Sequence, residues 1–224
     1  MRQFEGIFLD FYGTVAGGDR QAVHDVCQAV VDDYGLVADA ADLASRWGDL
    51  YFAVIESLDG QEFRLLRAIE GETLIETVRP LGVEIDASQY VEQLNAYLAR
   101  PALFDEAHEV LAKLRLPVCI VSNADEYEIR QAIAHHGLDF DYLVTSESAR
   151  SYKPEPGIFR AALKLTGWRP GRVLHVGDSL HSDVGGAHNA GIKAAWVRRE
   201  VRIKDIGTEQ PEYTWDNLRP LLAL

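Results

Sequence analysis

The sequence predicts an α/β fold in which helices cover both faces of a doubly wound parallel sheet. Two observations lead to this prediction: short, continuous apolar runs recur along the chain, and segments of helical periodicity separate them. Continuous apolar runs are typical of parallel strands that are buried on both faces. Strands that alternate with helices are typical of a doubly wound sheet. The expected strands are residues 7–9, 118–121, 142–144, 173–176 and 194–197.

One long segment interrupts the alternation of strands and helices. From residue 16 to residue 100 the sequence shows helical periodicity and no convincing strand. We therefore expect a helical cap domain of residues 16–100, inserted after the first strand. The sheet domain is then discontinuous and consists of residues 1–15 and 101–224. The helices expected in the insert are residues 19–34, 41–58, 62–78 and 87–98.

Helix boundaries in the sheet domain have local signals. Asp125 and Glu128 have the spacing of a capping box, in which two side chains satisfy the free N–H groups of a first helical turn. Pro156 suits a first helical position. Ser182 or Asp183 is expected to begin a later helix.

Composition limits the classes of partner. The chain of 224 residues carries a net charge of −13, because 35 acidic residues outnumber 22 basic ones. An acidic surface repels phosphate backbones and anionic lipids, so we expect no nucleic-acid or membrane partner and a small anionic substrate bound within a cleft. Cys27 and Cys119 form no metal or disulfide spacing and are expected to be free thiols. With no apparent signal peptide, we expect a cytoplasmic protein, either a monomer or a homodimer.

Polar residues follow four of the expected strands. Asp10 follows the first run, Ser122-Asn123 the second and Asp178 the fourth, and Lys153 lies in the loop after the third. Ligands of doubly wound sheets bind at the carboxyl ends of the strands. These four clusters are therefore expected to meet in one crevice.

The residue types suggest a nucleophilic reaction. Asp10 can attack a substrate through its carboxylate, and Gly13 lets the chain turn sharply away from it. Hydroxyls of Thr14 and Ser122 and the amide of Asn123 can contact an anionic oxygen. Lys153 can keep Asp10 ionised and neutralise a transition state. Carboxylates of Asp10, Asp178 and Asp183 in one crevice would repel each other, and oxygen ligands of this kind suit Mg²⁺.

The four clusters, in this order, resemble the motifs of the haloacid dehalogenase superfamily. Four ordered motifs are a specific signal, whereas one alone would be weak. The resemblance covers the whole chain and implies a Rossmann-like core closed by a helical cap. It implies Asp10 as the nucleophile, Ser122 as an oxyanion or phosphoryl contact, Lys153 as the charge partner of Asp10, and Asp178 and Asp183 near Mg²⁺. The matching segments are Asp10-Phe11-Tyr12-Gly13-Thr14, Ser122-Asn123, Lys153-Pro154 and residues 177–183.

Two residues indicate different branches of that superfamily. Phosphatases usually place a second aspartate two residues after the nucleophile as acid and base, and here that residue is Tyr12. Dehalogenases often have tyrosine there, and they usually lack the aspartate matching Asp178 and work without metal. Tyr12 could still offer Mg²⁺ its backbone carbonyl. Because Asp178 is present, we expect a Mg²⁺-dependent phosphatase of a small phosphorylated metabolite that forms a covalent aspartyl intermediate.

Two alternatives stay open. The first is a metal-independent 2-haloacid dehalogenase, for which Arg46 of the insert resembles the cap arginine that holds the substrate carboxylate; Arg64 is a second candidate. Tyr12 would also line this substrate site. The second alternative is a non-catalytic binding protein on the same fold. Retention of Asp10 and Lys153 with Asp178 argues against it, because a binding protein does not need this charge cluster.

Overall fold

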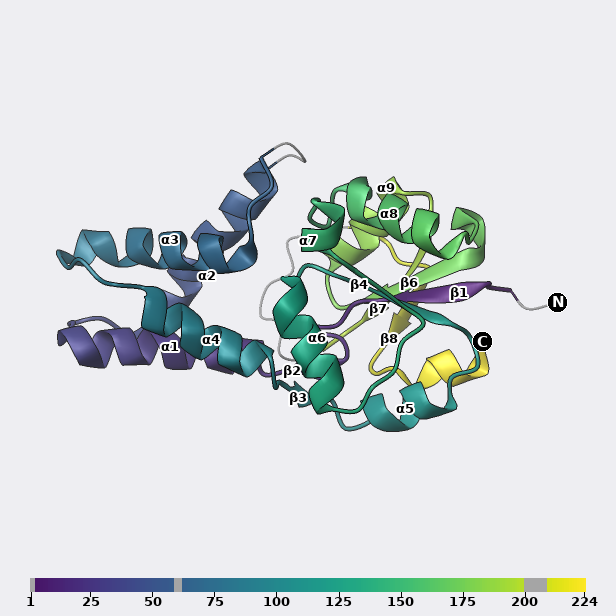
Figure 1. Cartoon of the computed structure of the whole chain (residues 1–224), viewed down its shortest axis with the longest axis horizontal. Helices are drawn as coiled ribbons and strands as arrows, with labels where there is room; N and C mark the ends of the chain where they lie inside the picture. Colours follow the sequence, from purple (N-terminus) through teal and green to yellow (C-terminus); the bar gives the residue numbers. More distant parts are fainter. Residues whose placement is uncertain (1–2, 59–61, 200–208) are drawn as a thin grey trace.

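The predicted α/β doubly wound fold is confirmed by a computed structural model, which describes residues 3–58, 62–199 and 209–224. In these residues six strands form one parallel sheet in the order β5-β4-β1-β6-β7-β8 (Figure 1). The chain starts at the middle of the sheet, builds β4 and β5 on one side, and then β6, β7 and β8 on the other. The strands are β1 Gly6–Leu9, β4 Val118–Ser122, β5 Tyr142–Thr145, β6 Val173–Gly177, β7 Lys193–Val197 and β8 Tyr213–Trp215.

Both faces of the sheet are buried under helices, which explains the continuous apolar runs. On β1, Ile7 and Leu9 pack on one side with α5 and α6, whereas Phe8 packs on the other side with α8 and α9. Successive residues of a strand point to opposite faces, so both kinds of position must be apolar. The helices of the sheet domain are α5 Ala107–Lys113, α6 Glu126–His135, α7 Ser146–Ala149, α8 Pro156–Thr166 and α9 Gly186–Asn189, with short helices η2 Pro170–Arg172, η3 Leu180–Gly185 and η4 Arg219–Ala223.

Four longer helices lie beside the sheet and not on its faces (Figure 1). These cap helices are α1 Asp19–Tyr34, α2 Ala40–Ser57, α3 Leu66–Val78 and α4 Ser88–Leu98, with η1 Arg79–Leu81 between α3 and α4. Their apolar residues form a separate cluster that includes Trp47, Leu74 and Tyr90. A two-stranded antiparallel ribbon of β2 Ala16–Gly17 and β3 Ala102–Leu103 joins them to the sheet. The carboxyl end of β1 points toward the cap helices.

The expected starts of two helices are wrong. Each of these helices begins where an Asp or Ser side chain accepts hydrogen bonds from its first turn, and the sequence alone does not locate such contacts. Asp125 precedes α6 but does not cap it; its carboxylate accepts hydrogen bonds from the backbone N–H groups of Leu66 and Arg67. Helix α3 therefore begins at Leu66 and not at residue 62. The later helical turn begins at Leu180, earlier than expected, because the Ser179 side chain accepts a hydrogen bond from the Ser182 N–H.

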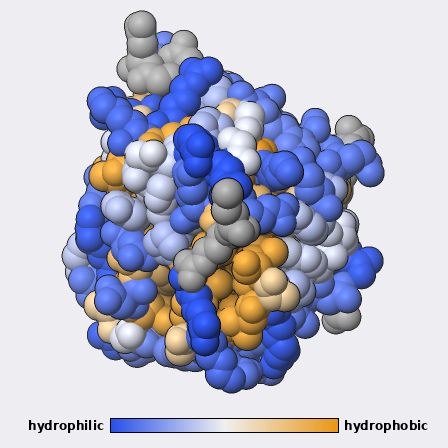
Figure 2. Space-filling view, turned by 90° about the vertical axis from the view of Figure 1, so that its right-hand side faces the viewer, coloured by the Kyte–Doolittle hydropathy of each residue, from blue (hydrophilic) through white to orange (hydrophobic). Residues whose placement is uncertain are grey.

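The end of the molecule opposite the cap helices has a largely hydrophilic surface with an apolar area within it (Figure 2). Exposed Leu222 of η4 lies near the C-terminus, beside Leu114 and Leu116. Among the described residues, no helix has both the length and the apolar character that crossing a membrane requires.

Candidate active site

Asp10 lies directly after β1, at the sheet edge that faces the cap helices, and is buried. Its two carboxylate oxygens have different partners. Oδ1 accepts hydrogen bonds from Ser122 Oγ at 3.0 Å and from Lys153 Nζ at 2.7 Å. Oδ2 accepts one from Thr14 Oγ1 at 3.1 Å. The structure thus brings three of the expected residues together around the Asp10 carboxylate.

A tight turn after Asp10 carries the chain away from the sheet. Gly13 has a φ of 88°, in the left-handed region that favours glycine. A Cβ at this position would lie 2.7 Å from the carboxylate oxygens of Asp178. The turn therefore needs glycine at position 13 for two reasons, its backbone angle and the close approach of Asp178. Thr14 Oγ1 lies 3.1 Å from Asp10 and 3.5 Å from Asp178 Oδ1.

Lys153 connects two of the three buried carboxylates. Its ammonium group donates to Asp10 Oδ1 at 2.7 Å and to Asp183 Oδ1 at 2.6 Å. His175 Nε2 lies 2.9 Å from the same Asp183 oxygen, and the Ser179 N–H donates to Asp183 Oδ2 at 2.9 Å. Both oxygens of Asp183 are therefore occupied by protein donors.

The ion pairs at Lys153 set the charges of the cluster. Burial alone would lower the pKa of Lys153, but Asp10 and Asp183 reverse this effect and raise the pKa to about 12. Burial would raise the pKa of Asp183, but Lys153 and His175 outweigh it and hold the pKa far below its ordinary value. Burial raises the pKa of Asp10, against the opposing effect of Lys153. Lys153 thus carries a firm positive charge next to the candidate nucleophile.

Asn123 contacts Lys153 through the backbone. Its Nδ2 donates to the Lys153 carbonyl at 3.1 Å, and its Oδ1 accepts from the Lys153 N–H at 2.7 Å. This reciprocal pair fixes the loop that carries the lysine. The structure therefore places Asn123 behind Lys153. Among the described residues, none of the hydrogen bonds to Asp10 comes from Asn123.

Tyr12 is tied to a cap helix. Its hydroxyl donates to the carbonyl of Leu98, at the end of α4, at 2.8 Å. Burial, reinforced by nearby carboxylates, raises the pKa of Tyr12 well above its ordinary value. A phenol that holds its proton so firmly is a poor base near neutral pH. Tyr12 joins cap and sheet at the place where a phosphatase would have its acid.

The other expected substrate contact, Arg46, lies on α2 with an exposed side chain. Among the described residues, no hydrogen bond or ion pair joins it to the Asp10 cluster. Arg64 pairs instead with Glu72. Asp178 lies within the cluster, because single oxygens of Asp10, Asp178 and Asp183 come within 4.8 Å of one another.

Several contacts that support the site were not expected from the sequence. The Tyr152 hydroxyl, next to Lys153, donates to the carbonyl of Arg64 in the cap segment. Buried Arg199 donates to the Thr14 carbonyl at 2.6 Å and pairs with Glu106 at 2.8 Å. Only His175 had a readable signal, as one polar residue inside an apolar run. The others join residues far apart in sequence.

The comparisons with known proteins agree with this geometry. The model of the haloacid dehalogenase-like hydrolases matches residues 4–191. The chain belongs to this hydrolase family. Several relatives that match most of its length are named (S)-2-haloacid dehalogenases. The one from Pseudomonas putida is 28% identical over 222 residues, which is 97% of this chain and 95% of the relative. The one from Xanthobacter autotrophicus is 31% identical over 189 residues, which is 76% of this chain and 74% of the relative.

Solved structures of this hydrolase family have the same fold. The L-2-haloacid dehalogenase from Xanthobacter autotrophicus superposes with a TM-score of 0.80 at 23% identity, and the match covers 99% of this chain and 98% of that one. A relative that is named as a phosphatase matches a smaller part of the chain. The mouse N-acylneuraminate-9-phosphatase is 32% identical over 127 residues, which is 54% of this chain and 51% of that protein.

These relatives correct two expectations. The phosphatase assignment is wrong, because the relatives that match nearly the whole chain are named dehalogenases. The Mg²⁺ expectation is wrong for the same reason, since the dehalogenase branch is the one expected to work without metal. The donors in the site give the physical reason. Lys153 bridges Asp10 and Asp183, and both Asp183 oxygens are already bonded, so the repulsion that suggested a cation is relieved by the protein itself.

Proposed function

We propose that this hydrolase is a 2-haloacid dehalogenase, which replaces the halogen on C2 of a small 2-halocarboxylate with hydroxyl. The observation that supports this best is Tyr12. It stands where a phosphatase needs an acid, its proton is held by the Leu98 carbonyl, and its pKa is far too high for proton transfer. A halide leaves as a stable anion and needs no proton. The names of relatives that match nearly the whole chain support the same reaction.

The partners of Asp10 suggest which oxygen attacks. Oδ1 accepts from both Ser122 and Lys153, whereas Oδ2 accepts only from Thr14. The less engaged Oδ2 is the better nucleophile. In the first step Oδ2 forms a bond to C2 of the substrate, the C2–halogen bond breaks, and its electron pair leaves with the halide. Asp10 is then an ester.

Hydrolysis of this ester regenerates the carboxylate. Water adds to Cγ of Asp10, and negative charge develops on Oδ1, where the Ser122 hydroxyl and the Lys153 ammonium already point. Donors placed before the reaction at such an oxygen are a large source of catalysis. We assign the proton of the water to Asp178, whose carboxylate lies against Gly13 and Thr14 beside the nucleophile. The bond from Cγ to the ester oxygen then breaks, its electron pair leaves with that oxygen, and Asp178 returns the proton to it, so the 2-hydroxy acid departs with its C2–oxygen bond intact. Asp10 loses the remaining proton of the added water to solvent and is a carboxylate again.

The substrate carboxylate needs a cationic partner from the cap. We keep Arg46 for this role on the basis of its sequence context, with Tyr12 lining the same site. Removal of Arg46 as Arg46→Met should raise KM more than it lowers kcat, because a carboxylate contact is present in both ground state and transition state. Arg64→Met is the matched control. A larger effect from Arg64→Met would transfer the role to Arg64.

Halide release from (S)-2-chloropropanoate, measured with a chelator present, tests the proposed reaction. The wild type should release chloride, and Asp10→Asn should lower kcat by about 10³-fold or more. A single turnover in ¹⁸O-labelled water should place the label in Asp10, as read by peptide mass spectrometry, and not in the product. Label found directly in the product would exclude the ester on Asp10. Phosphate release from aryl phosphates without halide release from haloacids would refute the dehalogenase proposal.

A further inference from the structure

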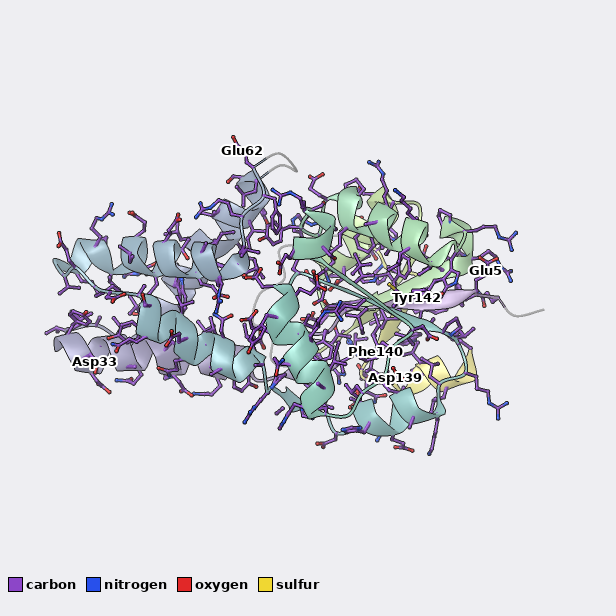
Figure 3. All side chains as sticks on the ribbon, viewed as in Figure 1. Glu5, Asp33, Glu62, Asp139, Phe140 and Tyr142 are labelled. Atoms are coloured by element: carbon purple, nitrogen blue, oxygen red, sulfur yellow. The ribbon has the colours of Figure 1, made fainter. Side chains whose placement is uncertain are left out.

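His175 is a polar residue in the middle of β6, one of the two central strands of the sheet. The rest of the strand is apolar, and the His175 side chain is fully buried. It points to the face of the sheet that α8 and α9 cover, where its ring lies nearly perpendicular to that of Phe159, with 4.9 Å between the ring centroids. Side chains fill the space between this face and the two helices (Figure 3). An apolar side chain would fit this position without any buried polar atom.

Only one nitrogen of the His175 ring has a hydrogen-bond partner in the part of the chain that the structure describes. Nε2 lies 2.9 Å from Oδ1 of Asp183, whereas Nδ1 is buried without a partner. Asp183 is paired with the Lys153 ammonium at 2.6 Å, so its carboxylate is ionised and can only accept. Nε2 therefore carries a hydrogen and donates it to Asp183. A buried nitrogen without a partner is costly, and the hydrogen bond to Asp183 is the contact that offsets this cost.

Asp183 connects His175 to the nucleophile. Its side chain lies on the face of β6 that His175 and Gly177 share, and a Cβ at Gly177 would overlap it. Oδ1 accepts hydrogen bonds from both His175 and Lys153, and Oδ2 accepts one from the backbone of the turn after β6. The Lys153 ammonium also donates to Oδ1 of Asp10 at 2.7 Å. A continuous chain of buried groups thus runs from the interior of the sheet to the nucleophile.

We propose that His175 is a positioning residue for dehalogenation, which fixes Asp183 and thereby keeps the Lys153 ammonium on Oδ1 of Asp10. This inference rests on the proposed function. During hydrolysis of the ester, negative charge develops on Oδ1, and a donor stabilises it best when it is in place before the reaction. During the attack of Oδ2 on the substrate, the carboxylate loses charge. His175 therefore serves the hydrolysis step more than the first step, and it acts through Asp183 and Lys153.

Three replacements of His175 separate the hydrogen bond from the volume of the side chain. In His175→Gln, the side-chain amide N–H can lie where the Nε2–H of the imidazole lies. In His175→Asn, the shorter side chain places its amide near the position of Nδ1, out of reach of Asp183. His175→Leu has about the shape of asparagine and offers no donor. His175→Gln should therefore keep most of the wild-type activity, and the other two variants should lose it.

Rapid mixing with saturating (S)-2-chloropropanoate measures the two steps separately. Chloride released in the first turnover reports formation of the ester, and intact-protein mass spectrometry of quenched samples reports its loss. In His175→Asn and His175→Leu, the rate constant of ester loss should fall by about tenfold or more, because the donor at Oδ1 is displaced. The rate constant of chloride release should change by less than about threefold. Both constants are first-order at saturation, so they do not depend on how much of each variant is folded.

Val173→Ala is the matched control. Val173 lies two residues before His175 on the same face of β6, belongs to the apolar cluster of that face, and has no side-chain donor. Both of its rate constants should equal those of the wild type. Equal losses in both steps for all three His175 variants would indicate a role in packing alone and overturn the proposal. Wild-type rate constants in His175→Asn would overturn it as well.

Two measurements without turnover separate this inference from the proposed function. In the wild type, ¹⁵N NMR of the His175 ring should show a hydrogen on Nε2; a hydrogen on Nδ1 alone would overturn the proposal. In crystal structures, Lys153 Nζ should keep its hydrogen bond to Asp10 Oδ1 in His175→Gln and lose it in His175→Asn. That result supports the role of His175 even if no haloacid releases halide. Unchanged positions of Asp183 and Lys153 in His175→Asn would overturn that role, whether or not dehalogenation occurs.

Discussion

Glu70 makes the stability of the protein depend on pH in a way that can be predicted in sign and size. Burial is the largest effect on its pKa; Asp125 and Glu128 act in the same direction, Asn95 and Arg67 oppose them, and together they raise the pKa from 4.5 to about 7. The folded protein therefore binds this proton more tightly than the unfolded chain. The resulting stability is complete below about pH 4.5 and is lost as the pH rises through about 7. The shift corresponds to a destabilisation of about 3 kcal/mol above neutral pH.

Replacement of Glu70 with glutamine removes this titration and keeps the side-chain shape. Urea unfolding of wild type and Glu70→Gln at about pH 5 and about pH 8 measures the difference. The variant should gain about 2 to 3 kcal/mol relative to the wild type between the two pH values. Glu72→Gln, in which an exposed carboxylate is removed from the same helix, should show a much smaller change. Parallel pH profiles for wild type and Glu70→Gln would refute a raised pKa at Glu70.

Three further substitutions test the support of the site. Gly13→Ala should lower kcat by about 10²-fold and stability by about 1 to 2 kcal/mol, because its Cβ would meet Asp178 at a left-handed φ; unchanged kinetics would contradict this. Asp125→Ala should lower the free energy of unfolding by about 1 to 2 kcal/mol and speed hydrogen exchange in the first turn of α3. Unaltered exchange there would exclude capping of α3 by Asp125. Arg199→Met should cost about 3 to 5 kcal/mol, since it leaves a buried carboxylate unpaired and releases the Thr14 carbonyl; a melting temperature equal to wild type would exclude this role.

The sheet could be predicted because its strands are buried on both faces. Five expected apolar runs correspond to β1, β4, β5, β6 and β7. The edge strand β8 was not predicted, because Tyr213–Trp215 is only partly buried and its short sequence has no continuous apolar signal. The ribbon of β2 and β3 has two residues in each strand, too few for any periodicity. Cap helices α1, α2 and α4 had amphipathic patterns, and α1 has the bounds that its periodicity predicts.

The meeting of Asp10, Ser122, Lys153 and Asp183 could be predicted from topology alone. Parallel strands end at the same edge, so residues that follow them converge even when more than 100 positions separate them. Contacts between the cap helices and the sheet domain could not be predicted in this way. The bond from Leu66 to Asp125 joins residues 59 positions apart in two different layers, and no sequence pattern specifies how the layers are oriented.

The failed Mg²⁺ expectation shows what a count of charges by residue type leaves out. Three carboxylates at one edge were expected to need a divalent cation, but that argument did not include the position of the lysine ammonium. Lys153 Nζ lies 2.7 Å from Asp10 and 2.6 Å from Asp183, which places its charge between them. His175, buried in β6, adds a third contact to Asp183. The same ammonium that relieves the repulsion binds Asp10 Oδ1 and leaves Oδ2, which accepts only from Thr14, as the less engaged oxygen. The charge arrangement and the proposed carbon–halogen chemistry thus have one structural origin.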